Sequence, residues 1–173
     1  MRGWLLDTNI LRSLTDRKHE HHNAVAARLQ EIPSTEPVYV SAVTAGEVEY
    51  GIRCYPKMPS EKKHLLRFVL DDFLLLTITE NTKAPYASIR AKLFENTIKK
   101  GKKGMRPEQI VDPVTSLRLG VQENDIWITA QAVERGLTLV THDRKMQRLW
   151  EAANGDLRVA DWGDPEFAWP ENG

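Results

Sequence analysis

Short apolar runs alternate along the chain with longer segments of helical periodicity. The opening run, Trp4-Leu5-Leu6, is as apolar as a buried parallel strand and ends abruptly in Asp7-Thr8-Asn9. Further strands are expected at 38–40, 73–78, 137–140 and 157–159, and helices at 8–14, 20–30, 42–52, 60–71, 79–99, 123–135 and 143–152. The alternation predicts an α/β fold, a three-layer α/β/α sandwich with a central, mostly parallel sheet of four to five strands.

Several boundaries follow from residues with known roles at helix ends. Ser41 is expected to be the N-cap of the helix that follows it, and Gly136 to stop the helix that precedes it. Pro85 is awkward inside the 79–99 helix, so the regular part is expected to begin near that residue. The segment 101–120, rich in glycine and lysine, has poor periodicity and predicts an extended loop or an inserted hairpin.

Length and composition indicate one ordinary globular domain. The chain has 173 residues, 41% of them hydrophobic and 28% charged. We expect a domain over 1–160 with an insertion at about 100–120, and a C-terminal tail over 161–173. No apolar run approaches the ~20 residues of a membrane helix, and no signal-peptide pattern opens the chain, so a cytoplasmic location is the default expectation. Cys54, the only cysteine, is expected to be a small apolar filler.

Net charge is zero, but the charges are unevenly distributed. The segment 83–106 contains eight basic residues and one acidic residue, whereas the segment 151–173 contains six acidic residues and one arginine. The basic stretch is as compatible with a phosphate-contacting face as with a solvated helix and a lysine-rich loop.

Four acidic residues are expected at one edge of the sheet, where the carboxyl ends of the strands meet. Asp7 ends the first strand, and Glu47 lies about one and a half turns into the helix after the second. Asp143 follows the fourth strand, and Asp125 lies in the first turn of the helix leading to that strand, beside the neutral amide of Asn124.

Taken singly, Asp125 and Asp143 have a structural explanation, because acids are common at helix N-termini. Asp7 gains little from capping alone. Several carboxylates at one point repel each other and raise one another's pKa, and a hard divalent cation removes that penalty. Oxygen ligands suit Mg²⁺ or Mn²⁺, and such a site suits phosphodiester hydrolysis.

Four stretches together resemble the PIN-domain ribonucleases, particularly the VapC-like toxins of bacterial type II toxin–antitoxin pairs. They occur in the family's order and span roughly residues 2–160: Leu5–Ile10, Ser41–Gly51, Asn124–Ala132 and Gly136–Asp143. Each motif alone is weakly specific, but four in register are a strong signal.

The resemblance implies a site and partners. The metal ligands and catalytic residues would be Asp7, Glu47, Asp125 and Asp143, and the side chains that orient them would be Thr8, Asn9, Asn124 and Thr141. Glu49 is a rival of Glu47 but points about 200° around the helix. The implied activity is a Mg²⁺- or Mn²⁺-dependent endoribonuclease acting on RNA, held inactive by an antitoxin, and the implied assembly is a homodimer.

Two segments depart from the family pattern. The connection from Thr97 to Leu119 looks longer than usual, and the tail from Trp162 onward is extra. The aromatic residues Phe167 and Trp169 are expected to cover a surface of their own chain.

Histidines gather near one predicted helix start, at His19, His21 and His22. Such clusters can bind transition metals, but these are flanked by charged residues, and solvated helix-end positions are the favoured interpretation. His142 adjoins Asp143 and could equally reach a phosphate or be a simple surface residue.

Two other functions are less compatible with the sequence than a nuclease. Phosphatases of the haloacid-dehalogenase class need a second aspartate two residues after the first, where this chain has Asn9. A catalytically silent PIN-like module for RNA binding or scaffolding is the other alternative, and the presence of all four acids argues against it.

Overall fold

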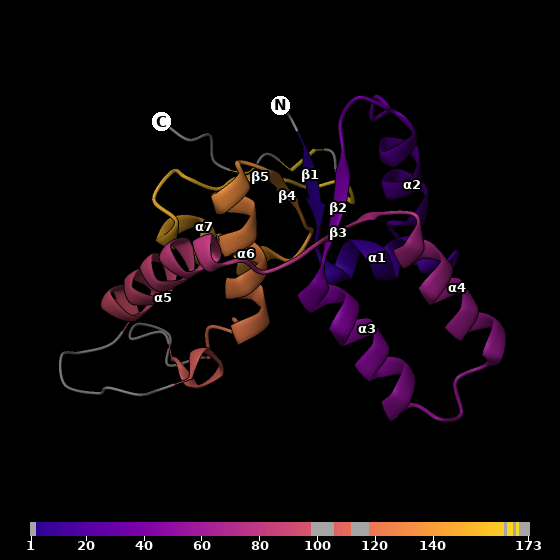
Figure 1. Ribbon diagram of the computed structural model, residues 1–173, viewed down its shortest axis with the longest axis horizontal. Coiled ribbons are helices and arrows are strands. Elements are labelled where there is room, and N and C mark those ends of the chain that lie inside the picture. Colours follow the sequence, from indigo (N-terminus) through magenta and orange to yellow (C-terminus); the bar gives the residue numbers. More distant parts are fainter. Residues whose placement is uncertain (1–2, 98–105, 112–117, 165, 168, 170–173) are drawn as a thin grey trace.

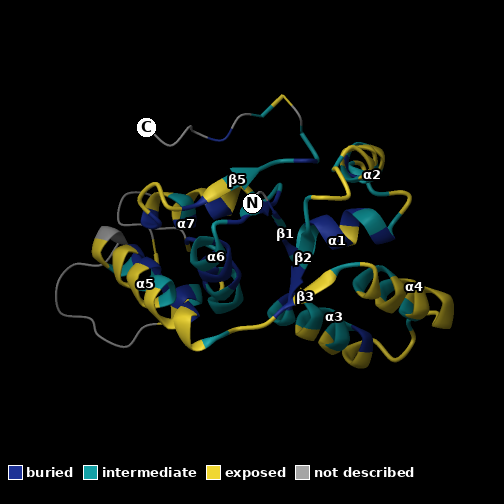
Figure 2. Cartoon of the chain, turned by 45° about the horizontal axis from the view of Figure 1, so that its top comes forward, coloured by how far each residue is buried: buried dark blue, intermediate teal, exposed yellow. Residues whose placement is uncertain are grey.

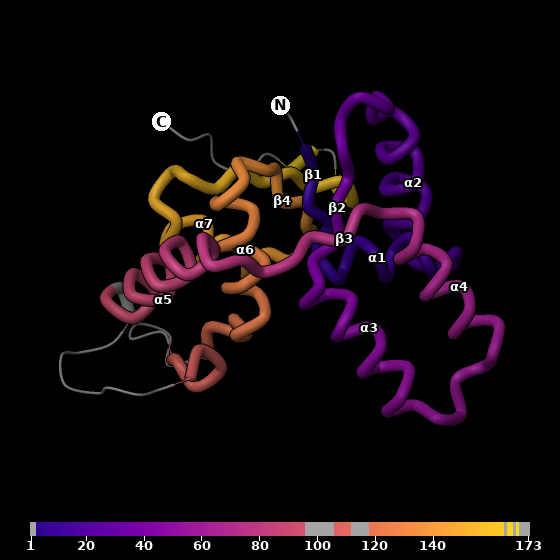
Figure 3. Tube along the Cα trace, in the orientation of Figure 1, coloured from indigo at the N-terminus to yellow at the C-terminus, as the bar shows by residue number. Residues whose placement is uncertain are grey.

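The computed structural model describes residues 3–97, 106–111, 118–164, 166–167 and 169 (Figure 1). Within them, five strands form one parallel sheet in the order β3-β2-β1-β4-β5. The strands are β1 Trp4–Leu6, β2 Val38–Ser41, β3 Leu74–Leu76, β4 Thr138–Val140 and β5 Arg158–Ala160. The trace in Figure 3 shows the opening strand β1 between β2 and β4, which come from distant parts of the sequence.

Helices cover both faces of this sheet (Figure 1). They are α1 Thr8–Thr15, α2 His22–Gln30, α3 Ala42–Cys54, α4 Ser60–Asp71, α5 Lys83–Thr97, α6 Glu123–Arg135 and α7 Gln147–Ala152, with short 3-10 turns η1 Glu80–Thr82, η2 Pro107–Gln109 and η3 Arg144–Met146. Helices α1, α2 and α4 lie on one side, and α5, α6 and α7 on the other. The three-layer α/β/α architecture expected from the sequence is confirmed.

Alternation along the central strands divides the core into two clusters. Leu5 of β1 and Leu139 of β4 pack with α5, α6 and α7, whereas their neighbours Leu6 and Val140 pack with α1 and α2. All four side chains are fully buried. Burying each contributes about 1.5–3 kcal/mol, so β1 is fixed on both faces and its carboxyl end is a rigid place for a functional group.

Predicted boundaries agree closely with the observed ones where a capping residue marks them. The Ser41 hydroxyl accepts a hydrogen bond from the backbone N–H of Val43 and caps α3. Gly136 ends α6 in the left-handed conformation, with φ +60°. Pro85 lies in the first turn of α5, which is preceded by the separate turn η1, as expected for a residue without an amide hydrogen.

The long connection before α6 is partly described. It contains η2 and an isolated antiparallel bridge between Val111 and Arg118. The predicted extended loop or inserted hairpin over 101–120 falls mostly on residues outside the described part of the chain. Residues 98–105, with most of the lysines of the basic stretch, lie outside the described part of the chain.

Burial divides the surface unevenly (Figure 2). Exposed large apolar residues gather on α3, α4 and the edge strand β3, including Tyr50, Phe68 and Leu75. Cys54 ends α3 on this exposed side, so the expectation that it fills an apolar space is wrong.

The C-terminal aromatics behave as expected. Trp169 is buried in the cluster on the α5–α6–α7 side, and Phe167 packs edge-on against it. In the described residues, no helix has both the length and the apolar character required to cross a lipid bilayer.

Candidate active site

A pocket of about 360 Å³ lies at the carboxyl edge of the sheet. Each of the four acids reaches it from a different element. Asp7 directly follows β1, Glu47 projects from α3, Asp125 stands in the first turn of α6, and Asp143 is the N-cap of η3. The structure therefore brings together all four acidic residues that the sequence placed at this edge.

The Asp7 carboxylate is held by neutral donors. Its Oδ1 accepts from the Thr8 backbone N–H at 2.7 Å, which makes Asp7 the N-cap of α1. Its Oδ2 accepts from Asn9 Nδ2 at 2.7 Å and from the Thr141 hydroxyl at 2.8 Å. Asn9 also donates to Thr141 Oγ1 at 2.9 Å, so the three side chains form one closed network around a buried carboxylate.

Glu47 is fixed in the same manner from two other elements. Its Oε2 accepts from the Thr8 hydroxyl at 2.6 Å, and its Oε1 accepts from Asn124 Nδ2 at 2.8 Å. Thr8, Asn9, Asn124 and Thr141 thus each contact one of the acids, and Asn124 bonds Glu47 rather than its neighbour Asp125.

Asp125 and Asp143 also serve as local caps. Asp125 Oδ2 accepts from the Gln122 backbone N–H at 2.7 Å, and Asp143 Oδ1 accepts from the Lys145 backbone N–H at 2.9 Å. The structural explanation given for these two acids is therefore correct as far as it goes, but both side chains line the pocket as well.

Gln131, which the sequence analysis did not single out, connects the two helices that carry Glu47 and Asp125. Its fully buried side chain accepts from the Ser41 hydroxyl at 2.5 Å and donates to the Leu76 carbonyl at 3.0 Å. Because Ser41 caps α3 and Gln131 belongs to α6, this contact fixes the spacing between the helices.

Burial and mutual repulsion act on the carboxylates in the same direction. Burial raises the pKa of Asp7 to about 6, and the charges of Asp143 and Glu47 add to the rise. Burial likewise raises the pKa of Asp125 to about 7, with further increases from Asp7, Glu47 and Asp143. The raised pKa values of Asp7 and Asp125 therefore reflect both their burial and the negative charge gathered in the pocket.

The chemistry of these donors fits a hard divalent cation. The pocket offers four carboxylates, and their nearest hydrogen-bond donors are uncharged hydroxyl, amide and backbone groups. As the side chains stand, the described residues contain no three His, Cys, Asp or Glu groups arranged as a finished cation site. A cation would have to draw the carboxylates toward one another.

Glu49, the rival of Glu47, lies elsewhere. Its carboxylate accepts from Arg67 at 2.6 and 3.0 Å, and it borders a separate pocket with Ala45 and Leu70. The Arg67 guanidinium lowers the pKa of Glu49, the opposite of the effect on Asp7.

The sequence analysis also did not identify two cationic side chains in the pocket. Arg12 and Lys145 line it together with the acids, and neither makes an ion pair among the described residues. A helical signal for Arg12 was present, since it lies four residues after Thr8 and so on the same face of α1. Gly120, with φ +76°, also lines the pocket, and a β-carbon there would stand 2.8 Å from Lys145 Cδ.

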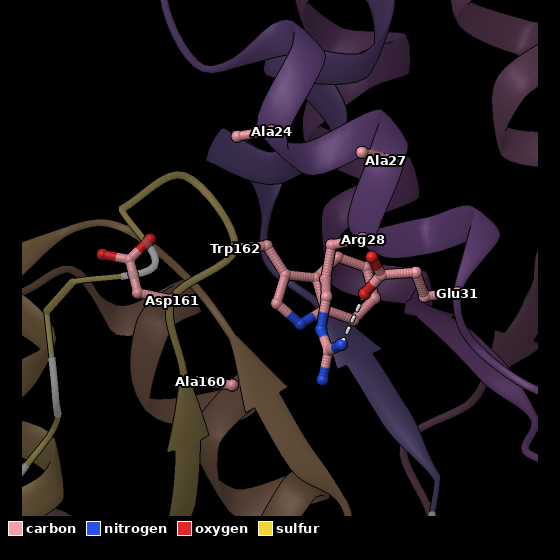
Figure 4. A pocket seen from close by; sticks show the side chains of 7 residues that line it. All are labelled: Ala24, Ala27, Arg28, Glu31, Ala160, Asp161 and Trp162. Atoms are coloured by element: carbon pink, nitrogen blue, oxygen red, sulfur yellow. Dashed lines mark hydrogen bonds and ion pairs between the residues drawn. The ribbon is translucent and has the colours of Figure 1, made fainter.

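A larger pocket of about 480 Å³ opens between α2 and the end of β5 (Figure 4). Arg28 and Glu31, three residues apart at the end of α2, pair with each other at 2.7 Å beside the indole of Trp162. Its walls carry two acids, Glu31 and Asp161, and each has an arginine partner, so the pocket lacks the set of four carboxylates that gives the smaller pocket its chemistry.

The histidines are arranged differently from the sequence expectation. His19 and His21 contact the ring of His142, next to Asp143, whereas His22 bonds the Ser13 carbonyl. The helix-end position is confirmed for His21, the N-cap of α2, but His19 and His21 are only partly exposed because both pack against His142 in the loop after β4. Burial lowers the pKa of His142.

The sequence model of the PIN domain matches residues 4–151 of the chain. No protein of curated function shows a significant sequence match.

Three solved structures are similar in fold. VapBC2 from Rickettsia felis, bound to a DNA fragment from its promoter, has 17% identity and a TM-score of 0.65, covering 92% of this chain and 98% of that chain. VapBC-1 from nontypeable Haemophilus influenzae has 19% identity and a TM-score of 0.64, with coverages of 94% and 99%. FitAcB from Neisseria gonorrhoeae has 24% identity and a TM-score of 0.62, with coverages of 90% and 95%.

Proposed function

The chain belongs to the PIN domain family, and on that premise we propose that it is a metal-dependent endoribonuclease and the toxin of a toxin–antitoxin pair. The observation that carries the proposal is the meeting of four acids from four separate elements in one pocket. The proposed catalytic residues and metal ligands are Asp7, Glu47, Asp125 and Asp143.

A bound Mg²⁺ or Mn²⁺ ion would supply Lewis acidity, activation of a water molecule and stabilisation of the leaving oxygen. The chain's own residues prepare the site for it. Thr8 and Asn124 aim the Glu47 carboxylate, while Asn9 and Thr141 aim that of Asp7. Since all these donors are neutral, they orient the acids without cancelling their charge.

Arg12 and Lys145 are the groups we assign to the substrate. An acidic pocket alone would repel a polynucleotide, and cations at the same pocket offset that repulsion. Arg12 can hold two phosphate oxygens at once through its planar guanidinium, whereas Lys145 acts as a point charge. We assign them to phosphates of the RNA strand at the cleaved bond.

The proposed partners follow from the solved structures and from the surface. The similar structures are toxin–antitoxin complexes, which supports an antitoxin as partner of this chain. The exposed apolar residues of α3, α4 and β3 suit protein–protein contact, with Leu75 60% and Phe68 65% exposed. A homodimer, action on RNA and a cytoplasmic site of action remain parts of the same proposal.

The test is incubation of the purified protein with total RNA in the presence of Mg²⁺ or Mn²⁺, with cleavage ends mapped. The wild type is compared with Asp7→Asn, which keeps the shape of the side chain and removes its charge. The proposal expects cleavage by the wild type, loss of cleavage on chelation and loss in Asp7→Asn. Equal cleavage by both proteins would overturn the catalytic assignment, and RNA binding without cleavage would favour the silent RNA-binding module.

A further inference from the structure

Three histidines from two distant parts of the chain form a triangle beside the acidic pocket. The ring centres of His19 and His21 are 5.6 Å apart, those of His19 and His142 are 5.9 Å apart, and those of His21 and His142 are 4.8 Å apart. Three imidazoles on one Zn²⁺ ion hold their ring centres about 5–5.5 Å apart, because each Zn–N bond is roughly 2.0–2.1 Å long. The observed triangle has that size.

The hydrogen bonds of the rings leave nitrogens available. His19 Nδ1 lies 3.2 Å from the Ser13 hydroxyl and 3.3 Å from the His21 backbone nitrogen, so its Nε2 is left for a ligand. His142 Nδ1 is buried and has no hydrogen-bond partner in the part of the chain that the structure describes. Among the described residues, His21 Nε2 has only a distant polar neighbour, the exposed Glu20 carboxylate at 3.7 Å.

A buried ring nitrogen without a partner is costly, and it normally indicates a bound group or a role for the residue. We propose that His19, His21 and His142 form a second cation site, specific for a borderline transition metal such as Zn²⁺, Co²⁺ or Ni²⁺. Imidazole nitrogen suits these ions, whereas the carboxylates of the neighbouring pocket suit Mg²⁺ or Mn²⁺. The proposal does not depend on the nuclease activity.

Binding requires a modest rearrangement, because the rings do not yet converge as in a finished site. The His21 side chain is 28% exposed and can turn, while His19 is anchored through Ser13 and His142 through its backbone N–H, which donates to Asn9 Oδ1 at 3.4 Å. The backbone of Gly163 approaches closely from the other side: a β-carbon there would stand 2.9 Å from His21 Cγ and 3.2 Å from His142 Nδ1. Asp161 holds that loop by accepting from the backbone N–H groups of Gly163 and Asp164.

A cation at this site would tie the turn between α1 and α2 to the segment that carries Asp143. It would therefore stabilise the fold locally and restrain one wall of the acidic pocket. The consequence to measure first is binding itself, since restraint of the wall follows from it.

The experiment is calorimetric titration of the purified full chain with Zn²⁺, with Mg²⁺ in excess to occupy the acidic pocket. The same titration is run on Asp7→Asn, where that pocket is impaired. We expect one Zn²⁺ site in both proteins, a loss of affinity of at least tenfold in His21→Asn and in His19→Asn, and visible absorption of tetrahedral Co²⁺ that disappears in the same two variants.

His22→Asn is the matched control, because it is adjacent in sequence but its ring bonds the Ser13 carbonyl outside the triangle. It should bind Zn²⁺ as the wild type does. Circular dichroism of each variant separates loss of ligands from loss of fold. Absence of Zn²⁺ binding in Asp7→Asn, or equal affinity in His21→Asn and wild type, would overturn the proposal and leave the triangle as ring packing only.

Discussion

Glu47 and Glu49 lie two residues apart on α3, yet the structure surrounds them in opposite ways. Glu49 receives two hydrogen bonds from Arg67, and Arg53 lies 4.0 Å away, so its charge is cancelled at the surface. Glu47 receives hydrogen bonds only from the neutral side chains of Thr8 and Asn124 among the described residues, and it faces three further acids.

The difference distinguishes a carboxylate whose charge is neutralised in a surface ion pair from a carboxylate whose charge stays available to bind a cation. An arginine partner satisfies a carboxylate and removes its attraction for cations. Neutral donors fix a carboxylate in position and leave its charge in place. The acidic pocket uses the second arrangement at Asp7 as well, so the comparison extends from one helix to the whole site.

The largest effect is expected from removing the charge of Asp7, the most buried carboxylate of the pocket. Asp7→Asn should lower RNA cleavage about 10³-fold, equivalent to about 4 kcal/mol, because the buried carboxylate is lost while the surrounding donors remain. Initial rates on a defined RNA in Mn²⁺ measure the effect. A loss smaller than tenfold would mean that Asp7 only caps α1.

The free energy of unfolding should depend on pH in opposite directions for the buried acids of the pocket and for the ion-paired Glu49. The folded-state pKa of Asp7 is raised from 3.8 to about 6, so between these values the folded protein binds more protons than the unfolded chain. The free energy of unfolding of chelator-treated protein should therefore fall as pH rises through this window, by about 3 kcal/mol from Asp7.

Asp125, with its pKa at about 7, extends the same fall to neutral pH, whereas the lowered pKa of Glu49 contributes stability that is lost only as pH falls. Urea unfolding at pH 3.5 and pH 7.5, just outside the two ends of the window, measures the difference. Asp7→Asn should flatten the pH dependence. A stability that rises steadily over this range in the wild type would contradict the electrostatic description of the pocket.

The two glutamates can also be compared directly by matched variants. Glu47→Gln should lower cleavage about 10²-fold, because it removes one of the proposed cation ligands. Glu49→Gln should leave cleavage unchanged, since its partner Arg67 lies outside the pocket. Parallel rate measurements decide the point, and an equal loss in both variants would show that helix α3, rather than the charge of Glu47, is what the reaction needs.

The smallest effect is expected from the neutral donors. Thr8→Val keeps the shape of the side chain and deletes the hydroxyl that aims Glu47. We expect a loss of roughly tenfold in the apparent affinity for Mn²⁺, with a smaller change of the rate at saturating Mn²⁺. A lower rate at saturating Mn²⁺ with unchanged affinity would place Thr8 in contact with the substrate instead.

Much of this arrangement was readable from the sequence because it depends on local signals. Asp7 follows an apolar run, and Ser41 and Gly136 are residues with specific roles at helix ends, so strand ends and helix starts could be located to within a few residues. The parallel topology then brought the acids to one edge.

What the sequence did not give depends on the path of loops. Lys145 reaches the pocket, and His142 meets His19 and His21, only because the segment after β4 turns back over α1. Neither contact is reflected in the periodicity of apolar and polar residues along the sequence. The prediction that Cys54 fills an apolar space was wrong for a similar reason. The apolar character of a residue does not show whether its side of a helix end faces the core or the solvent.

The most direct test of the central claim is Mn²⁺ binding measured by electron paramagnetic resonance on three proteins at pH 7.5. Our account predicts that the wild type and Glu49→Gln bind Mn²⁺ with the same affinity and that Asp7→Asn binds at least tenfold more weakly. Equal binding by the wild type and Asp7→Asn, or no binding by the wild type, would contradict it.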